Sequence, residues 1–144
     1  MRVVADTNII VSGSLWAGIP RQILEGARAG SFQLLTTDAL LTELSTVLAR
    51  EKFRARLGRA GVTVEAVVLA LANLAEVVTP AEIPPTIVDD PADDQVLAAA
   101  IGGPADLVVS GDQHLLKLGS FRAVRIVTAR EALSVLAELG RRPK

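Results

Sequence analysis

Two carboxylates stand directly after apolar runs that are typical of buried parallel strands. Asp6 follows Arg2–Ala5, and Asp112 closes the exit from Leu107–Val109. In open α/β sheets, ligands bind outside the carboxyl ends of the strands, where the loops converge. We therefore expect both side chains to lie at the same edge of one sheet.

Two further acids are expected to reach that edge from helices. Asp94 lies in the first turn of a predicted helix, where the helix dipole offsets part of its charge. Glu43 lies among Leu40, Leu41 and Leu44 in a strongly apolar helix, where an unpaired buried carboxylate is costly. Glu43 therefore either faces solvent or has a cation as its partner.

Four carboxylates that meet in one pocket need positive charge. Two of them about 5 Å apart repel by roughly 3 kcal/mol at an effective dielectric constant near 20. The chain has no cysteine and one histidine, so an oxygen-only site favours Mg²⁺ or Mn²⁺ over Zn²⁺. Such ions activate water against phosphodiesters, which predicts a metal-dependent hydrolase.

The sequence gives little support to other ways of activating a nucleophile. A Ser-His-Asp triad would have to use His114, and no nucleophile-elbow motif is present. We interpret His114 as an exposed residue on a short helix after Asp112. The sequence also has no Gly-x-x-x-x-Gly-Lys loop to hold phosphate.

Strand-like and helix-like segments alternate along nearly the whole chain. The predicted strands are 2–5, 32–35, 76–79, 107–109 and 124–127. The predicted helices begin near Ile19, Thr37 or Asp38, Thr63, Asp93 and the capping box Thr128–Glu131; their ends are Gly30, Leu48, Leu74, Gly102 and Gly140. This order predicts an α/β fold with a mostly parallel sheet covered by helices on both faces.

Composition sets the outer limits. The 144 residues fit a single domain, 1–144, and a 50% hydrophobic content is ample for one core. We find neither a signal peptide nor an apolar run of the roughly 20 residues that span a membrane. With no cysteine to suggest an oxidising compartment, we expect a cytoplasmic protein without a membrane partner.

The net charge of −1 gives no overall signature of nucleic-acid binding, but basic residues are concentrated in one segment. The segment 50–59 has only Glu51 among its basic side chains, which are Arg50, Lys52, Arg54, Arg56 and Arg59. It is either a rim that binds RNA phosphates or a solvated helix face. The only tryptophan, Trp16, belongs either to an interface or to the interior.

Taken in order, the motifs resemble the PIN-domain family, especially the VapC-like ribonuclease toxins of toxin-antitoxin systems. The resemblance spans nearly the whole chain and rests on four pieces: Val3–Asn8, Glu43 within Leu40–Leu48, Asp90–Ala100 and Leu107–Asp112. It implies a three-layer α/β/α fold, dependence on Mg²⁺ or Mn²⁺, and endonucleolytic cleavage of RNA. It also implies a homodimer and a cognate antitoxin protein as partners.

Transferred residue by residue, the family's acidic site falls on Asp6, Glu43, Asp94 and Asp112. Asn8 and Ser110 are then polar residues that support the pocket. Asp94 is preferred to its neighbour Asp93 because Gln95–Ala99 places Asp94 in the family's Asp-x-x-apolar-Ala-Ala register. Asp93, or even Asp90, is left to assist through water.

The favoured interpretation is an endoribonuclease, and the alternative belongs to a different functional class. The alternative is a non-catalytic PIN-like regulator that binds RNA or a protein, against which the complete set of acids argues. A phosphate-accepting receiver needs a lysine that none of Lys52, Lys117 and Lys144 supplies after a predicted strand. A phosphatase with Asp6 as nucleophile usually has Asp-x-Asp-x-Thr, whereas this chain has Asp6-Thr7-Asn8.

Overall fold

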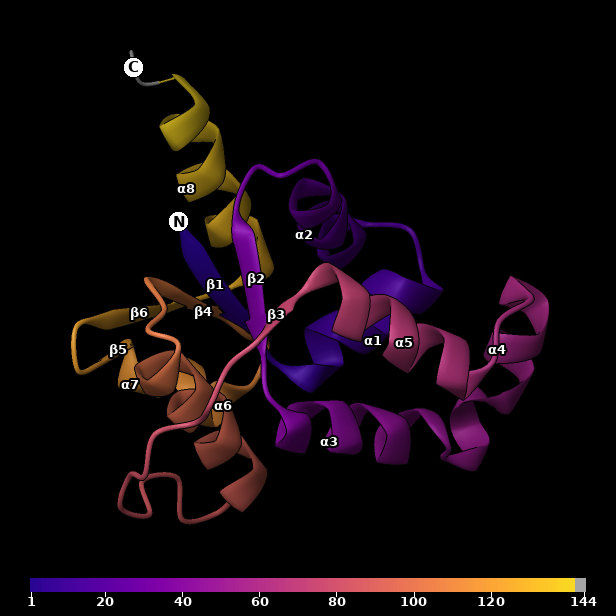
Figure 1. Ribbon diagram of the computed structural model, residues 1–144, viewed down its shortest axis with the longest axis horizontal. Coiled ribbons are helices and arrows are strands. Elements are labelled where there is room, and N and C mark those ends of the chain that lie inside the picture. The colour runs from indigo at the N-terminus through magenta and orange to yellow at the C-terminus, as the bar shows by residue number, and fades with distance from the viewer. Residues whose placement is uncertain (142–144) are drawn as a thin grey trace.

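A six-stranded sheet forms the centre of the computed structural model, which describes residues 1–141 (Figure 1). The strand order is β3-β2-β1-β4-β6-β5, and all neighbours are parallel except the antiparallel pair β5 and β6. The strands are β1 Arg2–Ala5, β2 Gln33–Thr36, β3 Glu76–Val77, β4 Leu107–Val109, β5 Ser120–Phe121 and β6 Val124–Val127. The mostly parallel sheet that the sequence predicts is confirmed.

Helices connect the parallel strands. They are α1 Thr7–Leu15, α2 Ile19–Arg28, α3 Asp38–Leu48, the short 3-10 helix η1 Glu51–Phe53, α4 Arg54–Ala60, α5 Val64–Leu74, α6 Pro91–Gly102, α7 Gln113–Leu118 and α8 Ala129–Arg141. Helix α8 runs past Gly140, so the predicted stop at that glycine is wrong. Residues 142–144 of the predicted domain lie outside the described residues.

The sheet separates two apolar cores, as alternating side chains along a strand require. Val3 and Val109 pack with residues of α1, α2, α5 and α8 on one face. Val4 and Val108 pack with residues of α6 and α7 on the other. The molecule is therefore the expected three-layer α/β/α sandwich, and Figure 1 shows α2 and α8 on the opposite side of the sheet from α6 and α7.

Helix α3 joins both cores at the carboxyl edge of the sheet. Leu40 in its first turn packs into the core beneath α6, whereas Leu44 and Leu48 pack into the core with α1 and α5. The Thr37 hydroxyl accepts a hydrogen bond from the Leu40 N–H at 3.2 Å and fixes where the helix begins. This position brings Glu43, between the two cores, to the strand ends.

Two elements were not predicted, and each has a physical reason. Helix α1 is buried on nearly all sides, so it has no polar stripe at helical spacing, and Ser12, Gly13 and Ser14 are weak helix formers. Strand β5 is joined to β6 through Arg122 and Ala123, whose φ angles are 48° and 70°. Hairpin turns with two positive φ angles are normally signalled by Asn-Gly or Asp-Gly, which this turn lacks.

No single helix within residues 1–141 is long and apolar enough to cross a membrane. Within the same residues, the segments Glu51–Ala60 and Val64–Leu74 are long and apolar enough only when they are taken together, and the chain bends sharply between them.

The close contact between α1 and α2 yields a stability prediction. A Cβ on Gly13 would lie 2.8 Å from the Pro20 carbonyl oxygen and 2.9 Å from Leu24 Cδ1. We expect Gly13→Ala to destabilise the fold by about 1–3 kcal/mol in urea unfolding, because the two helices must separate. Gly58→Ala is the matched control, since nothing lies within 4 Å of a Cβ there, and it should stabilise by up to about 1 kcal/mol. Equal effects at both positions would contradict the close packing.

Candidate metal centre

Asp6 is the most deeply fixed carboxylate of the site, with only 5% of the residue exposed. It caps α1, and its Oδ1 accepts a hydrogen bond from the Ile9 N–H at 3.0 Å. Its Oδ2 accepts a short hydrogen bond from the Ser110 hydroxyl. Burial raises the pKa of Asp6, an effect that these hydrogen bonds and the Gly111 N–H reduce and that nearby Asp112 increases.

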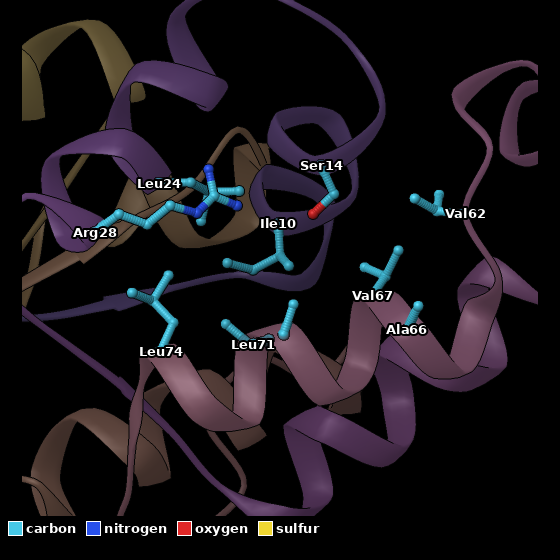
Figure 2. A pocket seen from close by; sticks show the side chains of 10 residues that line it. Ile10, Ser14, Leu24, Arg28, Val62, Ala66, Val67, Leu71 and Leu74 are labelled. Carbon is cyan, nitrogen blue, oxygen red and sulfur yellow. The ribbon is translucent and has the colours of Figure 1, made fainter.

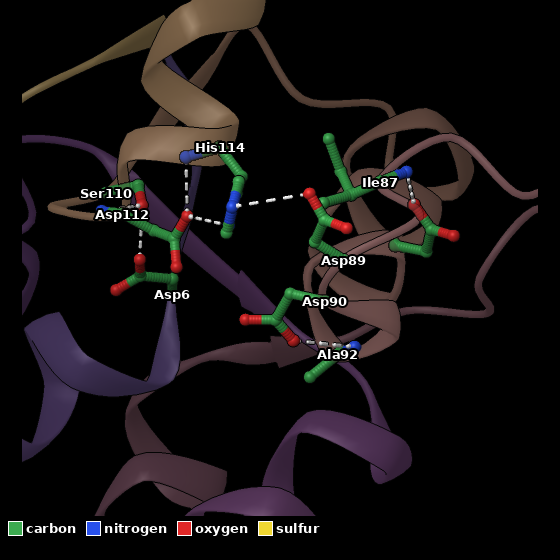
Figure 3. Close-up of polar contacts among 9 residues, drawn as sticks. Asp6, Ile87, Asp89, Asp90, Ala92, Ser110, Asp112 and His114 are labelled. Atoms are coloured by element: carbon green, nitrogen blue, oxygen red, sulfur yellow. Dashed lines mark hydrogen bonds and ion pairs between the residues drawn. The ribbon is translucent and has the colours of Figure 1, made fainter.

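Ser110 links the two acids that follow the central strands. Its side chain is fully buried, and its Oγ both donates to Asp6 and accepts a hydrogen bond from the Asp112 N–H at 2.9 Å (Figure 3). Strands β1 and β4 are parallel neighbours, with Ala5 paired to Val109, so Asp6 and Ser110 leave the sheet side by side. The sequence predicts Asp6 and Asp112 at one sheet edge, and the structure places them there with Ser110 between them.

Asp93 enters the same pocket from the first turn of α6. The residue is 6% exposed, and its Oδ2 is buried with no hydrogen-bond partner. Burial, followed by the charges of Asp112 and Asp90, raises the pKa of Asp93 to about 7. A buried carboxylate oxygen without a hydrogen-bond partner destabilises the fold unless a cation or a proton neutralises it.

Asp94 points away from this pocket, which corrects the predicted arrangement of four acids. Its Oδ1 accepts a hydrogen bond from the Ile87 N–H at 2.8 Å, and its Oδ2 accepts one from the Thr86 N–H at 3.2 Å. The side chain therefore holds the connection between β3 and α6, and it lines a different hollow with Pro85 and Pro91. Since α6 begins at Pro91 rather than at Asp93, the inward position of its first turn falls on Asp93.

Glu43 and Thr7 complete the pocket from α3 and α1. Burial raises the pKa of Glu43, and the charges of Asp90 and Asp6 act in the same direction. The neighbouring Thr7 hydroxyl and the Arg50 guanidinium lower it in part. The Thr7 Oγ1 is itself buried without a partner at hydrogen-bonding distance.

A cavity of about 50 Å³ lies among these residues. Its polar lining side chains are Asp6, Thr7, Asn8, Glu43, Asp90, Asp93 and Asp112. Within residues 1–141, the two buried side-chain oxygens without a hydrogen-bond partner, Thr7 Oγ1 and Asp93 Oδ2, belong to this lining. Five carboxylates, two orphaned oxygens and room for more than one water fit a hydrated divalent cation.

Three residues near the pocket, Asp89, Asp90 and His114, are not among the four ligands predicted from the sequence. Asp90 caps α6 through a 3.2 Å hydrogen bond from the Ala92 N–H, and His114 lies with its Nδ1 3.3 Å from Asp112 Oδ1. Asp89 approaches the other imidazole nitrogen at 3.9 Å. The Asp90-Pro91 pair is a helix-start signal that would have identified Asp90 as the cap, whereas no local signal brings residues 89 and 114 together.

The basic segment divides into exposed and structural members. Arg50, Lys52 and Arg54 are exposed at the end of α3 and in the following turn, and Arg54 pairs only loosely with Glu51 at 3.6 Å. Arg56 is half-buried, because its Nε donates to the Leu15 carbonyl at 2.7 Å and its guanidinium stacks over Trp16. Arg56 thus has a packing role that the sequence did not indicate.

A second cavity lies away from the acids, between α1, α2 and α5 (Figure 2). It measures about 160 Å³ and is mainly apolar, with Ile10, Leu24, Val67 and Leu71 in its walls and Arg28 at one side. Nothing in its lining resembles a cation site. Trp16, which directly follows the last residue of α1, is 40% exposed.

The chain matches the PIN domain over residues 2–114, which is well over half of its length. A search among curated proteins gave no significant match. PIN domains are usually metal-dependent nucleases, and the acidic cavity at the strand ends is consistent with that class. The match extends from the first strand to the start of α7 and includes every acid that lines the cavity. The chain therefore belongs to the PIN-domain family.

Proposed function

We propose that this protein is a metal-dependent endoribonuclease whose cation site is formed by Asp6, Glu43, Asp93 and Asp112. The observation that carries the proposal is the convergence of these carboxylates on a cavity that also holds Thr7 Oγ1 and Asp93 Oδ2 without partners. A stable fold rarely leaves such oxygens unpaired unless a ligand completes them. Oxygen ligands and the small cavity favour Mg²⁺ or Mn²⁺.

A bound divalent ion supplies Lewis acidity to a phosphodiester and lowers the pKa of an attacking water. The protein's own residues set the geometry for this chemistry. Ser110 and the Ile9 N–H hold the Asp6 carboxylate in one orientation, and the Ser110 hydroxyl ties Asp112 to it. Preorganised ligands of this kind need no rearrangement when the substrate arrives.

We further propose that Arg50, Lys52 and Arg54 bind the RNA backbone beside the cation site. They are exposed, and Arg50 is close enough to lower the pKa of Glu43. Arg50 lies two residues after the end of α3, the helix that carries Glu43. Arg56 is left out of this rim because of its contacts with Leu15 and Trp16.

A VapC-like toxin role, with a cognate antitoxin and a homodimeric state in the cytoplasm, is the biological setting we propose. It rests on the resemblance of the motifs and on surface that a partner is able to cover. The exposed Trp16 ring packs edge-on against Phe53, and the apolar cavity lies between α1, α2 and α5 (Figure 2). Exposed apolar surface of this kind often marks protein interfaces.

Incubation of purified protein with a pool of cellular RNA, and separately with single-stranded DNA, tests the activity. We expect RNA to be cut in the presence of Mn²⁺ or Mg²⁺, and not in excess chelator. Asp6→Asn should reduce the rate by about 100-fold or more while the fold is kept, because asparagine caps helices as well as aspartate does. Cleavage that survives chelation excludes the metal mechanism, and RNA binding without cleavage under every metal condition would favour the non-catalytic alternative.

The two neighbouring aspartates of α6 should behave in opposite ways. We expect Asp93→Asn to lose cleavage by about 100-fold or more and to raise the Tm of metal-free protein at pH 8, because an uncompensated buried charge is removed. Asp94→Asn should lower the Tm, since charge-assisted hydrogen bonds to Thr86 and Ile87 are weakened, and should keep cleavage within about tenfold. Circular dichroism melting and an RNA cleavage assay measure both effects. Loss of cleavage in Asp94→Asn with cleavage kept in Asp93→Asn would instead assign the catalytic role to Asp94.

The raised pKa values predict how the stability of metal-free protein depends on pH. Asp93 has a pKa of about 7 in the fold and 3.8 as its ordinary value, so the folded state binds the extra proton between these limits. Stability from this group is therefore full at low pH and is lost as pH rises through about 7, and Asp6 and Glu43 act in the same direction. We expect the Tm to be about 5 °C or more lower at pH 8 than at pH 5.5.

Mn²⁺ should recover most of that loss at pH 8 and have little effect at pH 5.5, where protons compete for the carboxylates. Asp93→Asn is the matched control and should flatten the pH dependence. A Tm that rises from pH 5.5 to pH 8 without metal would contradict the assigned burial of negative charge.

A further inference from the structure

We propose that the Trp16 ring is a stacking platform for one base of a single-stranded RNA, next to the basic segment 50–59. The inference rests on the proposed ribonuclease function and names the form of its substrate, an unpaired strand. Bases inside a duplex already stack on one another, so only an unpaired base is free to cover an aromatic side chain.

Trp16 is held at the surface and not in the core. It directly follows α1, its N–H donates to the Ser12 carbonyl at 3.0 Å, and 40% of the residue is exposed. Its ring packs edge-on against Phe53, with the ring centroids 6.3 Å apart, and Phe53 in turn packs against the core. Tryptophan is mostly buried in folded proteins, so a supported ring with this exposure is available to a ligand.

Arg56 fixes the ring in place. Its guanidinium carbon lies over the Trp16 ring, 5.2 Å from the ring centroid, and its Nε donates to the Leu15 carbonyl at 2.7 Å. The guanidinium is thus anchored to the end of the helix that the ring follows. A ring that is fixed before the ligand arrives loses little conformational entropy when a base stacks on it. Arg56 is therefore a positioning residue for Trp16.

The charges around the ring favour a polyanion as its ligand. The Lys52 Nζ lies over the Phe53 ring, 5.1 Å from its centroid. Arg50 and Arg54 are exposed in the same segment, 50–59, which has a single acid. Proteins bind single-stranded nucleic acid with this combination, because aromatic rings stack on bases while cations hold phosphates. Charge complementarity therefore favours RNA here, and a protein that covers the ring would compete with RNA.

The ring and the acidic cavity are close enough to bind one short strand. Asp6 caps the start of α1 and Trp16 ends it, so the helix between them rises about 15 Å along its axis. Arg50 is near enough to the cavity to lower the pKa of Glu43, and it begins the segment that contains Phe53. Single-strand-binding sites begin at roughly 4 nucleotides. The cut phosphate and the stacked base then belong to one strand, a few nucleotides apart.

Intrinsic fluorescence tests this assignment, because Trp16 is the only tryptophan and the chain has no tyrosine. A short unstructured oligoribonucleotide is added to full-length Asp6→Asn protein in Mg²⁺, so that the strand stays intact. We expect RNA binding to quench the Trp16 emission, as stacked bases quench indole. A single abasic nucleotide at one position, a few nucleotides from the cut phosphate, should relieve the quenching, and a duplex of the same sequence should quench much less.

Anisotropy of dye-labelled RNA measures what the ring contributes to binding, in the same Asp6→Asn background. Trp16→Ala should weaken binding by about 5- to 100-fold, and Trp16→Phe by much less, because a smaller ring still stacks. Circular dichroism melting checks that both variants fold, and the quenching measurement needs no substitution at the ring.

Phe121→Leu is the matched control. The Phe121 ring also lies under a cation, with the Arg122 guanidinium carbon 5.1 Å from its centroid. It belongs to β5, an edge strand that Figure 1 shows at the opposite end of the molecule from α4. The substitution should leave the RNA affinity unchanged.

RNA that binds without quenching would overturn the stacking site, and so would equal affinity for Trp16→Ala and its parent. Quenching that no abasic position relieves would overturn it as well. Each of these results leaves the proposed ribonuclease intact, since metal-dependent cleavage is assayed separately. Protein that neither binds nor cuts RNA would overturn both the stacking site and the proposed function.

Discussion

Concentrated negative charge at the carboxyl edge of the sheet is the constraint on which the rest of the structure depends. Five carboxylates line one small cavity, and burial raises the pKa of Asp6, Glu43 and Asp93. Pairs of such charges repel by several kcal/mol at the low dielectric of a protein interior. A cation or a proton can neutralise the charge in the cavity. Without either, the repulsion between the carboxylates lowers the stability of the folded protein.

The central strands and their helices hold this charge in place. Parallel pairing of β1 with β4 brings Asp6 beside Ser110, and the fully buried Ser110 hydroxyl joins Asp6 to Asp112. Asp6, Asp90 and Asp112 each cap a helix, so every one has a backbone N–H that fixes one oxygen. Because helix N-termini carry partial positive charge, the same contacts also reduce the cost of gathering the acids.

The sequence predicts the central strands well because β1, β4 and β6 are short runs of mostly apolar residues, each followed by a polar residue. It places Asp6 and Asp112 at one sheet edge for the same reason. In the first turn of α6 the family register points to Asp94, whereas the structure places Asp93 in the cavity. Asp93 shares a buried stripe with Val96, Leu97 and Ala100 at spacings of three, four and seven, a pattern that was available in the sequence. The meeting of His114 with Asp89 depends on tertiary structure and has no local signal.

The adjacent aspartates of α6 explain how a long irregular connection contributes to the site. Asp93 faces the cavity, and Asp94, about 100° further round the helix, accepts hydrogen bonds from the Thr86 and Ile87 N–H groups. Residues 86 and 87 lie a few residues before Asp90, so the outward aspartate fixes the loop that carries this acid to the cavity. One helical turn thereby places a carboxylate in the cavity on one side and secures the preceding loop on the other, so the two neighbouring aspartates have different structural roles.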